Sequence, residues 1–253
     1  MVHVKYEIKK IREGIFAVIV PDKYERAMLF LRCQEFYESP NPKFRGKSFD
    51  IWEYIEWYSK KNGGAFTYPS DWSGYNIPIP VIRNCLNLLD QEKVITPYDR
   101  IMTAIIDQIW WMNDKKTSDG YIIGTDSTKG DTFMHEVCHG LYFNNPSYKK
   151  AANYLIKNAI TEEHFQAFKS NLLKMGYATK VIKDEIQAYL LFGHYTEDFG
   201  RGVSLSERKK YHQLFQDKLG DIIYEGKQKT TGVISKIDQK RQPRKRANRL
   251  RVC

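Results

Sequence analysis

The 253-residue sequence predicts a mainly helical α+β fold, and three observations support this prediction. β-Branched and aromatic residues are concentrated in two short stretches, residues 3–20 and 121–126. Helix-capping patterns and apolar residues at helical spacing account for most of the remaining chain. Hydrophobic residues make up 42% of the composition, well above the level of disordered chains, so we expect a folded protein with a substantial core.

The N-terminal region, residues 1–116, is expected to be an α/β region that packs on the functional site or covers it. It should begin with one or two strands and continue as helices. Asp22-Lys-Tyr-Glu25 matches a capping box, which predicts a helix from there to about Tyr37. Apolar patterns predict further helices at residues 48–60, 79–91 and 97–113. The stretch from 63 to 75 contains two adjacent glycines and Trp72, and is expected to be a long loop that either lines a site or packs.

Residues 117–225 are expected to carry the functional site. The strand at 121–126 precedes a helix that starts at Asp131 or Thr132, both candidate N-caps, and ends near Phe143. Further helices are predicted at residues 147–159, 161–175, 179–192 and 204–224. The last region, residues 226–253, is polar and basic, and we expect it to be a largely disordered extension.

One helix in this region contains His135, Glu136 and His139 in the spacing His-Glu-x-x-His. Residues four apart lie on one face of a helix, so both imidazoles point into the same cavity, where they can bind one metal ion. Glu136 projects beside them, where it can take a proton from a metal-bound water. A pattern this short arises by chance in about one chain in a hundred of this composition, so its context has to decide.

The context is a strand, then a loop, then the helix with the motif, which is the order expected of a metallopeptidase. We expect the strand at residues 121–126 to pair with an extended peptide substrate through backbone hydrogen bonds. The helix would then carry the metal beneath that substrate.

A third metal ligand is expected downstream of the motif. One common pattern requires a histidine six residues after His139, but position 145 is Asn. The remaining candidates are Glu162, Glu163, His164, Glu185 and His194. Glu162 and Glu163 lie in the first turn of a helix, where the dipole favours acids without any metal. Glu185 lies on an otherwise apolar helix face and needs a partner there, so we expect it to complete the site.

These residues resemble those of zincin metallopeptidases of the gluzincin type, in which a glutamate on a later helix completes the metal site. His135, Glu136 and His139 match the first motif, and Asp184-Glu-Ile-Gln-Ala-Tyr189 is similar to the Glu-x-x-Ala pattern of the second helix. The resemblance covers residues 120–195. It implies a zincin-like catalytic domain with Zn²⁺ as cofactor, which hydrolyses peptide bonds in a peptide or protein substrate.

Other residues near these motifs are expected to assist the reaction or the fold. His194 and Tyr195 follow the second helix and are candidate donors to a developing oxyanion, with a surface position as the alternative for His194. Asp184 or Tyr189 is expected to orient a ligand imidazole, with a solvated acid or a packed ring as the alternative. Cys138 faces away from the two histidines and is expected to belong to the core.

The charge distribution suggests a second hypothesis. Seven of the ten net positive charges lie in residues 240–253, which contain seven basic side chains and no acid. Such a tail either binds nucleic acid or keeps the chain soluble. The alternative function is therefore that of a non-catalytic protein with a zincin fold, which binds nucleic acid through residues 240–253.

The cysteines and the lack of targeting signals indicate the cellular compartment in which we expect the protein. Four cysteines without paired spacing favour a reducing compartment. The sequence contains neither a signal peptide nor a stretch long enough to cross a membrane, so we expect an intracellular protein, cytoplasmic or nuclear, without a membrane partner. Oligomeric state is left open, and the motifs do not separate a peptidase from another metal hydrolase such as an amidase.

Overall fold

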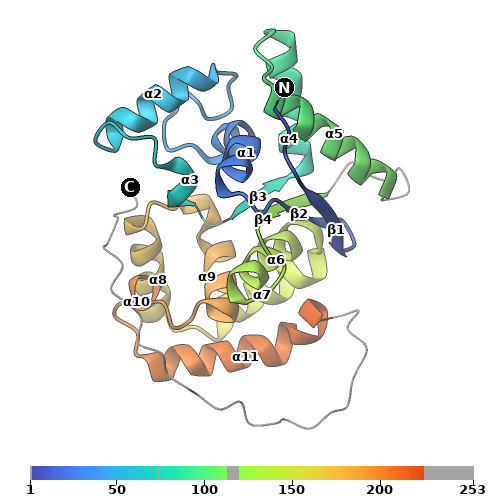
Figure 1. The fold of residues 1–253 in the computed structure, drawn as a ribbon. Helices are drawn as coiled ribbons and strands as arrows, with labels where there is room; N and C mark the ends of the chain where they lie inside the picture. The colour runs from blue at the N-terminus through green and yellow to red at the C-terminus, as the bar shows by residue number, and fades with distance from the viewer. Residues whose placement is uncertain (1, 73, 113–119, 225–253) are drawn as a thin grey trace, which may run out of the picture.

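The computed structural model describes residues 2–72, 74–112 and 120–224, in which a four-stranded sheet lies between two groups of helices (Figure 1). The strands are β1 (Glu7–Arg12), β2 (Ile15–Ile19), β3 (Tyr75–Pro78) and β4 (Tyr121–Thr125). They lie in the order β1-β2-β4-β3, with β2 and β4 parallel and both outer strands antiparallel to their neighbours. Strands from both sides of residue 117 thus share one sheet. The predicted mainly helical α+β class is confirmed.

The helices of the first half lie on one side of the sheet (Figure 1). They are α1 (Lys23–Glu38), α2 (Ile51–Lys61), α3 (Tyr68–Asp71), α4 (Ile79–Gln91) and α5 (Pro97–Met112). The predicted capping box starts α1, because Asp22 accepts a hydrogen bond from the backbone N–H of Glu25 at 2.8 Å. Phe30 of α1 stacks on Tyr75 of β3, with ring centroids 5.2 Å apart. Gly124 of β4 allows this contact, since a Cβ there would lie 2.6 Å from the ring of Phe30.

The helices of the second half cover the other side of the sheet and enclose a second hydrophobic core. They are α6 (Asp131–Asn144), α7 (Pro146–Asn158), α8 (Glu162–Lys174), the 3₁₀ turn η1 (Thr179–Val181), α9 (Ile182–Phe192), α10 (Glu197–Gly200) and α11 (Leu205–Tyr224). α6 lies directly against the sheet, because a Cβ at Gly140 would come within 3.0 Å of the Ile15 side chain of β2. Cys138 is fully buried in this core, as predicted.

Two expectations about the strands are wrong. The stretch from 63 to 75 is not a continuous loop, since it contains α3 and leads directly into β3. Only four residues form β3 and a proline ends it, so the alternation in its sequence is too short to be recognised. In addition, β4 is hydrogen-bonded to β2 on one side and to β3 on the other, so it cannot pair with a peptide substrate. Among the described strands, the free edge next to β4 belongs to β3.

The start of α6 also differs from the prediction. Its N-cap is Gly130, with φ of 87°, and no side chain caps the helix. Asp131 and Thr132 are already inside the first turn, where the acid of Asp131 still interacts favourably with the helix dipole.

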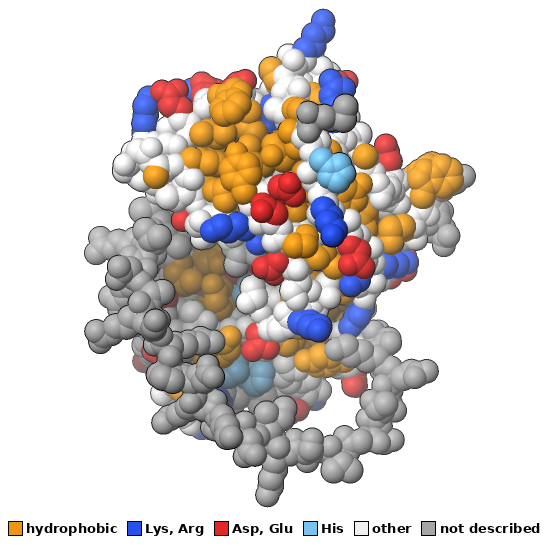
Figure 2. Space-filling view, viewed as in Figure 1, with side chains coloured by type: hydrophobic (Ala, Val, Ile, Leu, Met, Phe, Trp, Pro, Cys, Tyr) orange, Lys and Arg blue, Asp and Glu red, His pale blue; other side chains and the backbone are white. Residues whose placement is uncertain are grey.

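The aromatic residues of α2 belong to a packed cluster. Tyr54 is 1% exposed and its ring contacts those of Phe44, Phe49 and Trp57, which confirms that this face of the helix is core. Trp52 on the other face is 71% exposed. Figure 2 shows hydrophobic side chains gathered in the upper half of the molecule, over the region that α1 and α2 occupy in Figure 1.

Two further predictions concern membrane-spanning helices and the C-terminal extension. None of the helices that the structure describes is long and apolar enough to cross a bilayer. The predicted disordered extension, residues 226–253, and the basic segment within it lie outside the described residues.

A buried ion pair joins α1 to α5 and provides a test of this half of the fold. Arg32 is 2% exposed and donates to Asp99 at 2.8 Å, to the carbonyl of Val94 at 2.7 Å and to the carbonyl of Phe49. We predict that Arg32→Met lowers the free energy of unfolding by about 3 kcal/mol, because it leaves Asp99 buried without its cation. Urea unfolding followed by circular dichroism measures this change.

The control for this experiment is Lys60→Met, which removes an exposed ion pair with Glu56. Solvent screens that pair, so the control should leave the unfolding midpoint unchanged. An Arg32→Met protein as stable as the wild type would contradict the importance assigned to the buried pair.

Candidate metal centre

α6 and α9 bring the three predicted metal ligands together. His135 and His139 lie one turn apart on α6, with ring centroids separated by 4.9 Å, and Glu185 lies in the first turn of α9. His135 Nε2 is 3.7 Å from Glu185 Oε2, and His139 Nε2 is 3.7 Å from Glu185 Oε1. The two imidazoles and the carboxylate therefore point at one common space.

The chemistry of these donors fits a divalent metal such as zinc. One candidate ligand atom from each residue lies within 4.8 Å of the others, and ligands of a tetrahedral zinc ion are about 3.4 Å apart. Glu185 is 8% exposed, and its Oε2 has no hydrogen-bond partner. A buried carboxylate oxygen without a partner is costly, and a cation bound at this point would satisfy it.

The pKa values of the three side chains follow from burial and from their mutual contacts. Burial raises the pKa of Glu185 to about 7, against an opposing effect of His139. Burial and the neighbouring His139 lower the pKa of His135 to about 4, which keeps its imidazole in the neutral form that binds metals. Burial also lowers the pKa of His139, but Asp184 and Glu185 more than offset this effect and hold it well above its ordinary value.

Residues around the ligands fix their orientation. His139 Nδ1 lies 2.9 Å from Asp184 Oδ1, which places a proton on Nδ1 and turns Nε2 towards Glu185. Gln187 donates to the same oxygen of Asp184 at 3.0 Å, and so holds the carboxylate in place. Asp184 thus has the orienting position that the sequence suggested for it.

Two tyrosines lie beside these ligands. The edge of the Tyr189 ring packs on His135, with centroids 4.7 Å apart, and its hydroxyl lies 3.2 Å from that of Tyr177. Burial and the nearby Glu185 raise the pKa of Tyr177, and burial raises the pKa of Tyr189. Both phenols therefore remain protonated at neutral pH and can act as O–H donors. Sequence reasoning identified Tyr189 but missed Tyr177, which no local pattern marks.

A residue of the sheet, Asn76, holds the carboxylate of Glu136. Asn76 of β3 donates from Nδ2 to Glu136 Oε2 at 2.5 Å, and its Oδ1 accepts a hydrogen bond from the hydroxyl of Tyr121 at 2.6 Å. Gly74 lies close to the other carboxylate oxygen, since a Cβ there would be in ordinary van der Waals contact with Glu136 Oε1 at 3.9 Å. Sequence reasoning missed both Asn76 and Tyr121, because 60 residues separate Asn76 from Glu136.

The two predicted oxyanion donors lie elsewhere. The ring of His194 stacks on that of His212 at a centroid distance of 4.1 Å, and Tyr195 is 55% exposed. His194 lies nine residues after Glu185, which corresponds to about 13 Å along a helix axis. The structure does not place His194 or Tyr195 against the three ligands, and their assignment as catalytic residues gains no support from it.

The other candidate third ligands have separate roles. Glu162 and Glu163 are exposed in the first turn of α8, and His164 is hydrogen-bonded to the hydroxyl of Tyr211 at 2.8 Å. Glu185 is therefore the downstream candidate that meets the two motif histidines.

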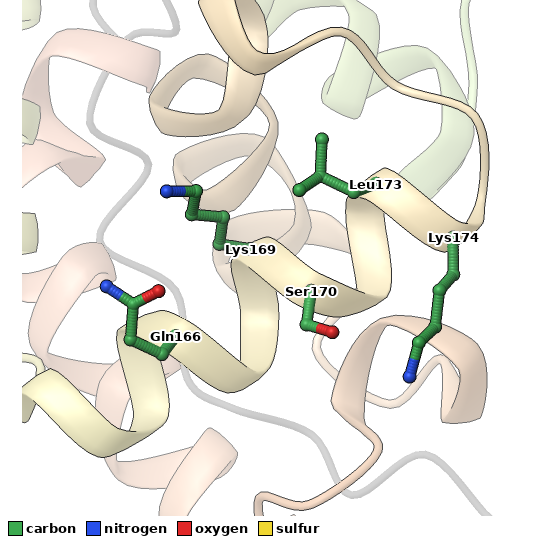
Figure 3. A pocket seen from close by; sticks show the side chains of 5 residues that line it. All are labelled: Gln166, Lys169, Ser170, Leu173 and Lys174. Atoms are coloured by element: carbon green, nitrogen blue, oxygen red, sulfur yellow. The ribbon is translucent and has the colours of Figure 1, made fainter.

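A shallow hollow of about 330 Å³ opens on α8 (Figure 3). Its lining consists of Gln166, Lys169, Ser170, Leu173 and Lys174, all from one helix. It contains neither an imidazole nor a carboxylate, so its chemistry does not suit a divalent metal.

The chain was also compared with known proteins. No protein-family model, curated protein or solved structure matches it. The case for the function of the site therefore depends on the geometry described above.

The role of Asp184 in the metal site can be tested by a substitution that keeps its shape. We predict that Asp184→Asn weakens Zn²⁺ binding by about 10- to 100-fold, because an amide no longer stabilises the Nδ1 proton of His139. Competition with a chromophoric chelator measures the affinity. Glu163→Gln, which changes an exposed acid of α8, should bind zinc like the wild type. Equal affinities for wild type and Asp184→Asn would exclude the proposed contribution of Asp184.

Proposed function

We propose that this protein is a zinc-dependent metallopeptidase with a gluzincin-like site. The observation that carries the proposal is the convergence of His135, His139 and Glu185 on one space, with an unpaired, buried oxygen of Glu185 facing it. A bound zinc ion would supply Lewis acidity, which lowers the pKa of a water molecule towards 7 and polarises a peptide carbonyl. A zincin-like fold, Zn²⁺ as the cofactor and hydrolysis as the reaction class belong to this proposal.

In this proposal Glu136 is the general base. Its Oε2 is engaged by Asn76, so its Oε1 accepts the proton of the attacking water and then delivers it to the nitrogen of the leaving amine. One carboxylate therefore serves both proton transfers.

The phenols of Tyr177 and Tyr189 are the proposed donors to the developing oxyanion. Their hydroxyls are protonated, lie within hydrogen-bonding distance of one another, and adjoin a metal ligand through the contact of Tyr189 with His135. Donors already oriented in a buried site stabilise developing charge without the reorganisation that solvent would need. This role replaces the one that the sequence suggested for His194 and Tyr195.

The position of β3 supports a peptide or protein as the substrate. β3 is the edge strand on the side of α6, and an extended peptide can add to such an edge through backbone hydrogen bonds. This arrangement favours an extended peptide over the small amides that another metal hydrolase, such as an amidase, would accept.

The alternative proposal, nucleic-acid binding through residues 240–253, concerns a segment outside the described residues. It remains a prediction from the charge of the sequence, and no contact among the described residues favours it.

The substitution Glu136→Gln tests the proposed reaction. We predict that it lowers kcat for hydrolysis of a fluorogenic peptide library by at least about 100-fold, because the amide cannot accept the proton of the water. Zinc content should stay at one ion per chain, since Glu136 is not among the three ligands. Peptide cleavage that persists at the wild-type rate would contradict the assignment of Glu136. A zinc-loaded wild-type chain that cleaves no peptide in the library would contradict the proposed function itself.

A further inference from the structure

Asn76 connects the base Glu136 to the edge strand of the sheet. The hydroxyl of Tyr121, which is 4% exposed on β4, donates to Oδ1 of Asn76 at 2.6 Å. The amide group of Asn76 turns its Nδ2 towards Glu136, where it donates at 2.5 Å. The reverse orientation would place the amide oxygen against the carboxylate, so that two acceptors faced each other. The carboxylate of Glu136, which can only accept, thus selects the orientation of the amide, and the hydroxyl of the buried tyrosine holds the amide oxygen in place.

The backbone of the same residue faces the free edge of β3. Ile79 N–H donates to Gly120 O at 2.7 Å, so these two residues form a hydrogen-bonded pair at the end of the antiparallel ladder between β3 and β4. Hydrogen-bonded pairs alternate along such a ladder, so Ile77 and Tyr75 are the residues of β3 that bond to β4. The N–H and C=O of Asn76 consequently point away from β4, towards the edge where a peptide would pair.

The alternation of side chains completes this arrangement. Tyr75 is directed to the face of the sheet that α1 covers, where its ring stacks on Phe30. The side chain of Asn76 is directed to the opposite face, where α6 presents Glu136. The backbone N–H and C=O of Asn76 thus face the outer edge of β3, where a peptide would pair, and its side chain contacts Glu136.

We propose that Asn76 is a positioning residue for Glu136 and that Tyr121 acts on the base only through Asn76. The pair engages Oε2 of the carboxylate and does not engage Oε1. This inference rests on the proposed peptidase function for its catalytic consequence, but the contact itself does not depend on that function. A base held in one orientation matters because a displacement of about 1 Å can reduce a rate by about 100-fold.

The kinetic test uses the full-length, zinc-loaded chain with Asn76→Ala, Tyr121→Phe and the double variant. We expect each single variant to lower kcat, by about 10- to 100-fold for Asn76→Ala, with KM within about twofold of wild type and zinc content unchanged. The double variant should be no slower than Asn76→Ala alone, because Tyr121 has no separate path to the base. Additive losses, or a loss confined to KM, would overturn the proposal.

Asn153→Ala is the matched control for these variants. Asn153 of α7 accepts a hydrogen bond from the hydroxyl of Tyr142 at 2.9 Å, which is the same kind of tyrosine–asparagine contact, but it does not touch Glu136. It should leave kcat unchanged. A fall in kcat equal to that of Asn76→Ala would indicate a general structural effect and would overturn the positioning role.

A second readout is independent of hydrolysis. In the metal-free protein, NMR resonances of the Asn76 side-chain amide are identified by their loss in Asn76→Ala. We expect them to shift in both Tyr121→Phe and Glu136→Ala, and not in Tyr142→Phe. Unshifted resonances in the first two variants would overturn the inference even if the protein is a peptidase. Absence of hydrolysis by the wild type, with the shifts observed, would instead reject the peptidase function while the contact stands.

Discussion

The buried carboxylate of Glu185 is the constraint on which the candidate site depends. It lies between α6 and α9, both imidazoles of the motif approach it, and one of its oxygens has no hydrogen-bond partner. An acid in this position destabilises the protein unless a cation or a proton satisfies it. A bound cation would also meet the neutral imidazole of His135 and the Nε2 of His139, which Asp184 turns inward. A bound divalent metal would therefore stabilise the buried carboxylate of Glu185.

In the proposed peptidase, the sheet determines how the candidate site would meet a substrate. α6 approaches β2 closely because Gly140 has no side chain, and this approach places Glu136 beside β3. β3 is short and antiparallel at the edge of the sheet; it has no further strand beside it among the described residues, and it supplies the amide that holds the proposed base. The first half of the chain, which carries none of the three candidate ligands, therefore contributes to the proposed chemistry through Asn76 of β3.

The extent to which the sequence predicts the molecule differs between local and distant features. The His-Glu-x-x-His spacing and the lone acid of an apolar helix face are local patterns, and they correctly brought His135, His139 and Glu185 together. The contact of Asn76 with Glu136 joins residues 60 positions apart, and nothing around Asn76 marks it. His194 was selected for its closeness in sequence to the second helix, but the axial rise of that helix carries it away from the ligands.

The secondary structure shows the same limit. Caps and apolar periodicity located the long helices, because these are properties of neighbouring residues. The partners of β4 depend on β2 and β3, which are distant in sequence, and so the strand expected to receive the substrate proved to be an inner one. Edge and inner strands are distinguished only by the tertiary fold.

X-ray absorption at the zinc K-edge tests the central claim most directly. For the full-length chain loaded with one equivalent of Zn²⁺, the account predicts a low-coordinate shell of nitrogen and oxygen donors at about 2.0 Å, with the scattering pattern of two imidazoles. His139→Ala should reduce that pattern to one imidazole. A sulfur shell at about 2.3 Å, or a shell of oxygen donors without imidazole, would contradict the assignment of His135, His139 and Glu185 as the zinc ligands.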